Sequence, residues 1–137
     1  MTNDKVLEQF DWVHARSECS VPHIFKELEQ GAREDVEAAQ SLIPPHSERK
    51  FSLAMTTTRR FSVIRVDDPM RGISRAVDFV CAKDKIEVYD GSNQLLYSTS
   101  LTLNNEGKCQ LLVKDKELTQ WQFRRTALEK LFFEPFD

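Results

Sequence analysis

The chain has 137 residues, of which 40% are hydrophobic and 30% charged, and its formal net charge is −3. These values exclude the low hydrophobicity and large net charge that are typical of disordered proteins. No segment approaches the roughly 20 apolar residues that a membrane helix needs, and the start of the chain lacks the features of a secretory leader. We therefore expect a single cytoplasmic domain over residues 1–137 that does not enter a membrane.

The chain contains three cysteines, Cys19, Cys81 and Cys109. Their number is odd and their spacings are wide, whereas small disulfide-stabilised domains carry closely spaced cysteines in even numbers. The sequence therefore predicts that all three cysteines are reduced thiols that bind no metal, as expected in a reducing compartment.

Charge is distributed unevenly along the chain. Residues 51–83 carry six basic and three acidic side chains, whereas both flanking segments are acidic overall. The basic segment contains Arg59, Arg60, Arg65, Arg71 and Arg75. Such a cluster can attract anions. We favour the simpler interpretation that these arginines lie on solvated strand faces beside acidic helices.

Two helices are predicted before residue 44. The first covers about Asp4–Glu18, with Asn3 as its N-cap, because apolar residues recur there at spacings of three and four. Pro22 then indicates a break and a new helix start, since proline is tolerated in a first helical turn. The second helix runs to about Leu42, where two consecutive prolines follow. Its apolar stripe comprises Phe25, Leu28, Ala32, Val36, Ala39 and Ile43.

Between residues 50 and 114 the apolar residues alternate, which is the signature of β-strands. Six strands are predicted there, separated by turns rich in glycine, asparagine and aspartate. The connections are too short for parallel pairing, which needs a crossover of a dozen or more residues. The sequence therefore predicts a six-stranded antiparallel meander.

A final helix is predicted within residues 118–134. Thr119 and Gln122 have the spacing of a capping box. We expect Trp121, Leu128 and Phe132 to face the sheet, while Phe123 and Phe133 point elsewhere. The fold class is therefore α+β, with two N-terminal helices, a six-stranded antiparallel meander sheet and a C-terminal helix packed on the sheet.

No catalytic or metal site is predicted. His14, Cys19 and His23 combine ligands that zinc prefers, and a histidine beside Cys19 would suit a cysteine nucleophile. However, the break at Pro22 separates these residues onto two helices, and no paired-cysteine motif supplies further ligands. The acidic pairs at 34–35 and 67–68 fit an exposed helix face and a turn. We therefore expect a non-enzymatic protein without a cofactor.

Nucleic-acid binding is also disfavoured. Arg59, Arg60 and Phe61 place positive charge beside an aromatic ring, as in sheet surfaces that bind single strands. The sequence pI of about 5.7 opposes this interpretation, and Phe61 fits a core position better. Any such binding should be weak and sensitive to salt.

Two functional hypotheses remain. The first is a protein-interaction or regulatory domain that binds a protein partner or forms a homo-oligomer through Phe133 and Phe136, because the C-terminal segment is more apolar than one core face requires.

The alternative is a domain that binds a small apolar or amphipathic ligand. The order of elements resembles that of helix-grip folds, whose curved sheet wraps a cavity under the last helix, although their usual first strand is missing. This resemblance implies a ligand cavity between the sheet and the C-terminal helix. Its expected lining residues are Phe79, Tyr97, Trp121 and Phe132.

Overall fold

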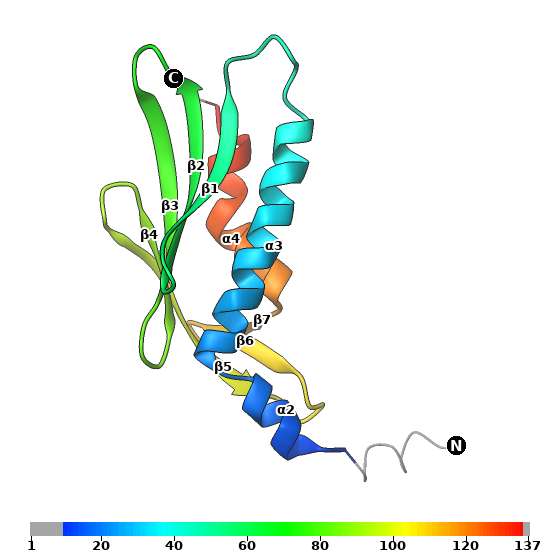
Figure 1. Cartoon of the computed structure of the whole chain (residues 1–137). Helices are drawn as coiled ribbons and strands as arrows, with labels where there is room; N and C mark the ends of the chain where they lie inside the picture. Colours follow the sequence, from blue (N-terminus) through cyan, green and yellow to red (C-terminus); the bar gives the residue numbers. More distant parts are fainter. Residues whose placement is uncertain (1–9, 136–137) are drawn as a thin grey trace.

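The computed structural model describes residues 10–135, and its elements follow the order helix, helix, seven strands, helix (Figure 1). The helices are α2 (Trp12–Glu18), α3 (Val21–Ser41) and α4 (Gln120–Phe133). The strands are β1 (Lys50–Thr57), β2 (Arg60–Asp68), β3 (Ile73–Cys81), β4 (Ile86–Asp90), β5 (Leu95–Leu103), β6 (Cys109–Val113) and β7 (Lys116–Leu118). Within this part of the chain, no helix combines the length and apolarity needed to cross a membrane.

The break between the two N-terminal helices is confirmed. Asp11 caps α2 by accepting a hydrogen bond from the His14 amide, and Ser20 caps α3 by accepting one from the His23 amide. Side-chain oxygens at these positions satisfy first-turn amides that have no partner inside a helix. The prediction of a first helix that runs unbroken from about Asp4 is wrong, because Phe10 and Asp11 are not helical and α2 begins at Trp12. The predicted Asn3 cap lies outside the described residues.

The seven strands form one antiparallel meander in the order β1-β2-β3-β4-β5-β6-β7, so the predicted topology is confirmed. The predicted count of six strands is wrong, because β7 follows β6 through a two-residue turn. Lys114 and Asp115 form this turn with φ values of 49° and 65°. Turns of this type normally contain glycine or asparagine, and their absence here removed the sequence signal.

Helices α3 and α4 stand side by side on one face of the long strands, while β5–β7 turn beneath the lower end of α3 (Figure 1). Four aromatic rings connect the layers. Phe61 stacks on Phe79 with centroids 4.6 Å apart, Phe25 of α3 lies 5.2 Å from Phe61, and Phe123 of α4 lies 6.3 Å from Phe79. Aromatic pairs at these distances contribute beyond their burial, so the space between sheet and helices is a packed core.

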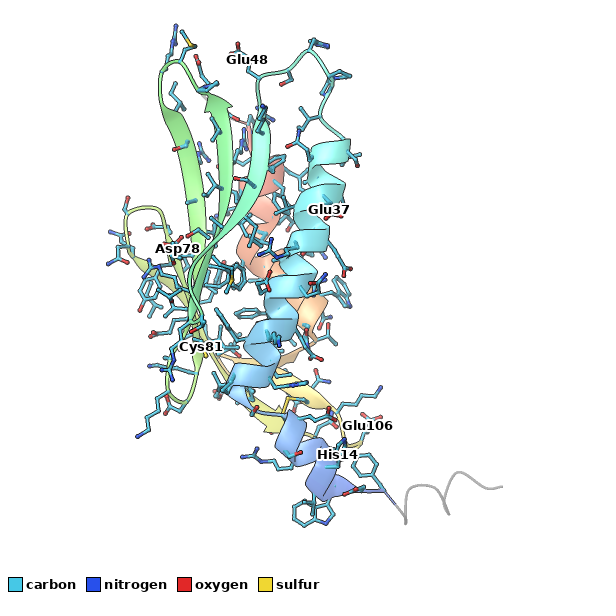
Figure 2. All side chains as sticks on the ribbon, viewed as in Figure 1. His14, Glu37, Glu48, Asp78, Cys81 and Glu106 are labelled. Atoms are coloured by element: carbon cyan, nitrogen blue, oxygen red, sulfur yellow. A yellow bond between two sulfur atoms is a disulfide. The ribbon has the colours of Figure 1, made fainter. Side chains whose placement is uncertain are left out.

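The opposite face of the sheet carries polar side chains. Asp78 and Cys81 lie on β3, an odd number of residues apart, and therefore project to opposite faces (Figure 2). Asp78 pairs with Arg60 at 2.6 Å and accepts a hydrogen bond from Ser62. Arg60 therefore behaves as expected for a charged residue on a strand face that is partly solvated.

The predicted sheet-facing side of α4 is wrong in part. Phe123, which was predicted to point elsewhere, is buried together with Ala127, Leu128 and Leu131, whereas Trp121, which was predicted to face the sheet, is 55% exposed. Phe132 is partly buried and packs edge-on against Phe51. The helix carries two apolar stripes, and both satisfy spacings of three or four residues. Periodicity alone therefore could not decide which stripe faces the sheet.

Candidate functional site

A groove of about 370 Å³ runs along the outer surface between α3 and α4. Ala38 and Ala39 of α3 line it together with Leu42, the C-cap residue of α3, and Trp121, Leu128, Phe132 and Phe133 line it from α4. The volume lies at the lower end of the range for ligand pockets. The lining is mainly apolar, so the groove is suited to receive an apolar side chain or helix face.

Three large apolar side chains project around this groove instead of into the core. The exposed fractions are 69% for Leu42, 55% for Trp121 and 66% for Phe133. Trp121 lies near the start of α4, while Phe133 is its last residue. The α3–α4 groove therefore has exposed apolar groups at both ends.

Polar contacts between the two helices fix the walls of the groove. Arg124 donates from Nε to Asp35 at 2.7 Å, and Gln120 donates to Glu27 at 2.7 Å. Gly31 makes the first contact possible, because a Cβ at this position would lie 2.5 Å from Nη1 of Arg124. The guanidinium thus lies against the α3 backbone, which explains a glycine inside a helix.

A second groove, of about 550 Å³, lies on the other side of α4. Its walls come from α4 and from the β3–β5 region of the sheet, and include Val77, Tyr97, Ala127 and Leu131. Its rim is polar, with Ser74, Ser92 and Lys130 among the lining residues. This second groove therefore lies where a cavity under the last helix was expected.

The four predicted ligand-binding residues do not line one cavity among the described residues. Phe79 is fully buried in the aromatic core, Tyr97 lines the second groove, and Trp121 and Phe132 line the α3–α4 groove. Helix α4 separates the two grooves, because its opposite sides face one each. Of the two predicted interface residues, Phe133 lies at the α3–α4 groove, and Phe136 is outside the described residues.

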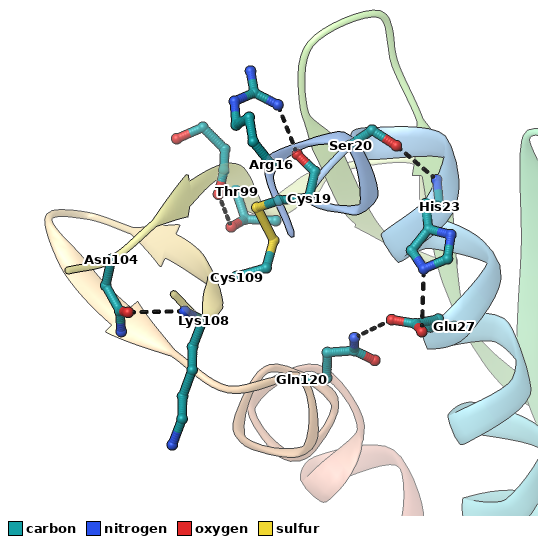
Figure 3. The surroundings of a disulfide bond; sticks show 11 residues. Arg16, Cys19, Ser20, His23, Glu27, Thr99, Asn104, Lys108, Cys109 and Gln120 are labelled. Atoms are coloured by element: carbon teal, nitrogen blue, oxygen red, sulfur yellow. Dashed lines mark hydrogen bonds and ion pairs between the residues drawn. A yellow bond between two sulfur atoms is a disulfide. The ribbon is translucent and has the colours of Figure 1, made fainter. Parts of the chain in front are cut away.

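The prediction of three reduced thiols is wrong. Cys19 and Cys109, which are separated by 90 positions in the sequence, form a disulfide with their Cα atoms 5.3 Å apart (Figure 3). The bond connects the junction of α2 and α3 to β6. Cys81 is the free cysteine, and it is buried on β3. Burial raises the pKa of its thiol even though the charge of nearby Arg59 acts in the opposite direction, so little reactive thiolate is present at neutral pH.

The disulfide also removes the candidate nucleophile and metal ligand. His14 lies 3.1 Å from Glu18 and His23 lies 3.3 Å from Glu27, each on its own helix. His23, Glu27 and Gln120 form a chain of contacts from α3 to α4 beside the disulfide (Figure 3). Within residues 10–135, no group of three or more histidines, cysteines or carboxylates could hold a metal ion.

The prediction that Arg65 lies on a solvated strand face is wrong, and sequence reasoning missed the role of this residue. Its side chain is fully buried and forms a bidentate pair with Asp67 at 2.9 and 3.1 Å. Nη1 also donates to the backbone oxygens of Leu131 and Glu134, at 2.9 and 2.6 Å. The guanidinium therefore caps the C-terminus of α4, where a cation also complements the helix dipole. The sequence signal was a charged residue in the apolar phase of β2, beside Phe61 and Val63.

The carboxylate of Asp67 is held between two cations. Burial alone would raise its pKa, but hydrogen bonds and charge from Arg65 and Arg49 outweigh burial, so the pKa lies below the ordinary value of 3.8. This network joins β2 to the end of α4 and so supports the fold. Phe61, the aromatic residue of the nucleic-acid hypothesis, is buried against Phe79 and presents no ring to a base.

Comparisons with models of protein families, with curated proteins and with solved structures found no match to this chain.

Proposed function

We propose that this protein is a non-enzymatic interaction domain whose contact surface is the α3–α4 groove. The observation that carries the proposal is the gathering of Leu42, Trp121 and Phe133 around one preformed groove. Each large apolar side chain contributes roughly 1.5–3 kcal/mol when it moves from water to a buried site. Scattered exposed apolar residues are common on protein surfaces, whereas clustered ones mark contact sites.

The walls of the groove favour a rigid docking surface. The Arg124–Asp35 and Gln120–Glu27 contacts hold the helices together, so binding does not require them to separate. Trp121 is the strongest single candidate for an energetic anchor, because tryptophan is enriched among residues that dominate interface energies.

Site-specific photo-crosslinking in the source cells tests this proposal. The photoreactive residue p-benzoylphenylalanine replaces Trp121 or Phe133 in separate variants. It replaces Arg33 in a matched control, since Arg33 lies on α3, away from the groove lining, and pairs with Glu29. We expect adducts of discrete mass from positions 121 and 133 and none from position 33. Absence of adducts at all three positions, or identical adducts from all three, would contradict the proposal.

Binding of a small amphipathic ligand is a second candidate function, and the second groove favours it. Its volume of about 550 Å³ falls within the range of roughly 300–1,000 Å³ for small-molecule pockets, and it has an apolar wall with a polar rim. Titration with the fluorescent probe 1-anilinonaphthalene-8-sulfonate tests it. Saturable binding that is lost when Ala127→Trp fills the groove would support this candidate. Probe binding that is equal in both proteins would contradict it.

A further inference from the structure

Four residues form a row along the exposed side of α4. Trp121, Arg125, Glu129 and Phe133 follow one another at intervals of four, the spacing of neighbours on one helix face. The side chains of Arg125 and Glu129 are 64% and 54% exposed, and both aromatic residues are more than half exposed. All four line the α3–α4 groove. We name them the α4 row.

The α4 row reads apolar, basic, acidic, apolar, and its midpoint is Ala127. If a second α4 lies antiparallel to the first about this midpoint, Trp121 faces the partner's Phe133, and Arg125 faces the partner's Glu129. Two-fold symmetry repeats each contact. Every aromatic residue of the row then meets an aromatic residue, and every charge meets its opposite.

We propose that the occupant of the α3–α4 groove is the same face of a second copy of this chain, paired antiparallel through the α4 row. This inference rests on the proposed function and names its partner. Two-fold interfaces use one surface patch twice, so the patch must be complementary to itself. The α4 row satisfies that requirement in both apolar and charged contacts.

The size of the surface limits the expected affinity. A helix rises about 1.5 Å per residue, so the α4 row spans roughly 18 Å. Two helices at a packing distance of about 10 Å then bury a contact area on the order of 400–600 Å² per copy, below the roughly 800 Å² of a standard interface. The dimer is therefore weak and depends on concentration, with dissociation constants of about 1–100 μM.

Sedimentation of the oxidised full chain from about 1 to 500 μM tests the pairing. The monomer mass is 15.9 kDa. We expect the wild-type average mass to rise towards twice this value. Arg125→Glu should weaken dimerisation about tenfold, because it places two carboxylates opposite each other at both contacts. Glu129→Arg should weaken it similarly. The double variant Arg125→Glu/Glu129→Arg restores opposite charges and should recover most of the wild-type affinity.

Two further variants control for trivial effects. Arg33→Glu changes an exposed arginine in a comparable i,i+4 pair away from the groove lining, and should leave the dissociation constant unchanged. Trp121→Ala should weaken dimerisation about tenfold while circular dichroism stays that of the wild type, since the side chain is largely exposed. Equal losses in Arg33→Glu and Arg125→Glu would overturn the proposal.

The remaining outcomes separate this inference from the proposed function. A wild-type protein that stays monomeric at all concentrations, with crosslinked adducts that do not have twice the monomer mass, overturns self-pairing and leaves the groove as a surface for another protein. A monomer without any adduct overturns both proposals. A wild-type dimer whose double charge variant is no stronger than the single variants overturns the antiparallel register.

Discussion

The two ends of α4 are stabilised by different means. At its start, Oγ1 of Thr119 accepts a hydrogen bond from the Gln122 amide and Oε1 of Gln122 accepts one from the Thr119 amide, so the cap uses residues three positions apart. At its end, Arg65 of β2 binds the oxygens of Leu131 and Glu134, which are 66 and 69 residues away. One end is stabilised locally and the other by the tertiary structure.

The start of α4 therefore depends on its own residues, whereas its end depends on the rest of the fold. The capping box can form as soon as the helix forms, because both partners belong to the same turn. The contacts of Arg65 exist only when β2 and α4 are packed together, and then a full charge is buried. The lower end of the helical layer also has a covalent connection, since Cys19 and Cys109 join the start of α3 to β6.

The largest effect is expected when the contacts of Arg65 with the C-terminal end of α4 are removed. Arg65→Ala leaves Asp67 with Arg49 alone and removes both hydrogen bonds to the end of α4. Removing one partner of a buried pair costs about 3–5 kcal/mol. Urea denaturation should show this loss of unfolding free energy, and hydrogen exchange should rise in the last turn of α4. Arg60→Ala, on the same strand but partly exposed, should lose less than about 1 kcal/mol. Equal losses would contradict the structural role of Arg65.

Removal of the disulfide tests the covalent connection between the start of α3 and β6. The double variant Cys19→Ser/Cys109→Ser should remain folded and lose about 2–4 kcal/mol of unfolding free energy, since the bond restricts the unfolded chain. Titration of thiols in denaturant, without reductant, should detect Cys81 alone in the wild type. Three reactive thiols in the denatured wild type would show that the bond does not form. A Cys81→Ala variant controls for the free thiol.

A change of pH distinguishes the contribution of the charged Asp67–Arg65 pair from that of the disulfide. The pKa of Asp67 is lowered in the folded protein, so its contribution is complete above the ordinary value of 3.8 and is lost as the pH falls through the folded pKa. Asp67→Asn should therefore cost roughly 1–3 kcal/mol at pH 7, and this difference should shrink below pH 3.8. Denaturation at several pH values measures it. In contrast, the loss of unfolding free energy in Cys19→Ser/Cys109→Ser should not shrink at low pH. A loss that stays constant with pH for Asp67→Asn would refute the charge argument.

The smallest effect is expected at the local cap. Thr119→Ala removes one side-chain acceptor and should cost about 1 kcal/mol. Thr119→Ser retains the hydroxyl and should cost a few tenths at most. If Thr119→Ala destabilised the protein as much as Arg65→Ala does, the contrast between the two ends would be wrong.

The sequence predicted what depends on neighbours in the chain. The break at Pro22, the capping box and the antiparallel meander all follow from local spacing and short connections, and the structure contains each of them. The pairing of Cys19 with Cys109 was not predictable in this way, because spacings along the chain do not reveal which cysteines meet in space. The two-residue turn before β7 lacked the residues by which such turns are recognised.

The candidate site was predicted only in part. Phe133 was expected to be exposed beyond the core face, and it lies at the α3–α4 groove. Trp121 was assigned to the core because it fits one of two competing apolar stripes. The choice between these stripes depends on how α4 is rotated about its axis, which contacts with α3 and the sheet decide.

The aromatic core has a consequence for how the chain matures during synthesis. Phe25 precedes the sheet and Phe123 follows it, yet both belong to the same group of rings around Phe61 and Phe79. A ribosome that has completed β7 has therefore produced α2, α3 and the sheet, but not the ring of Phe123 that completes the group. Until α4 leaves the exit tunnel, Phe79 of the nascent chain lacks its contact with Phe123. Synthesis of α4 therefore completes this group of rings, because Phe123 is the last of its four members in the sequence.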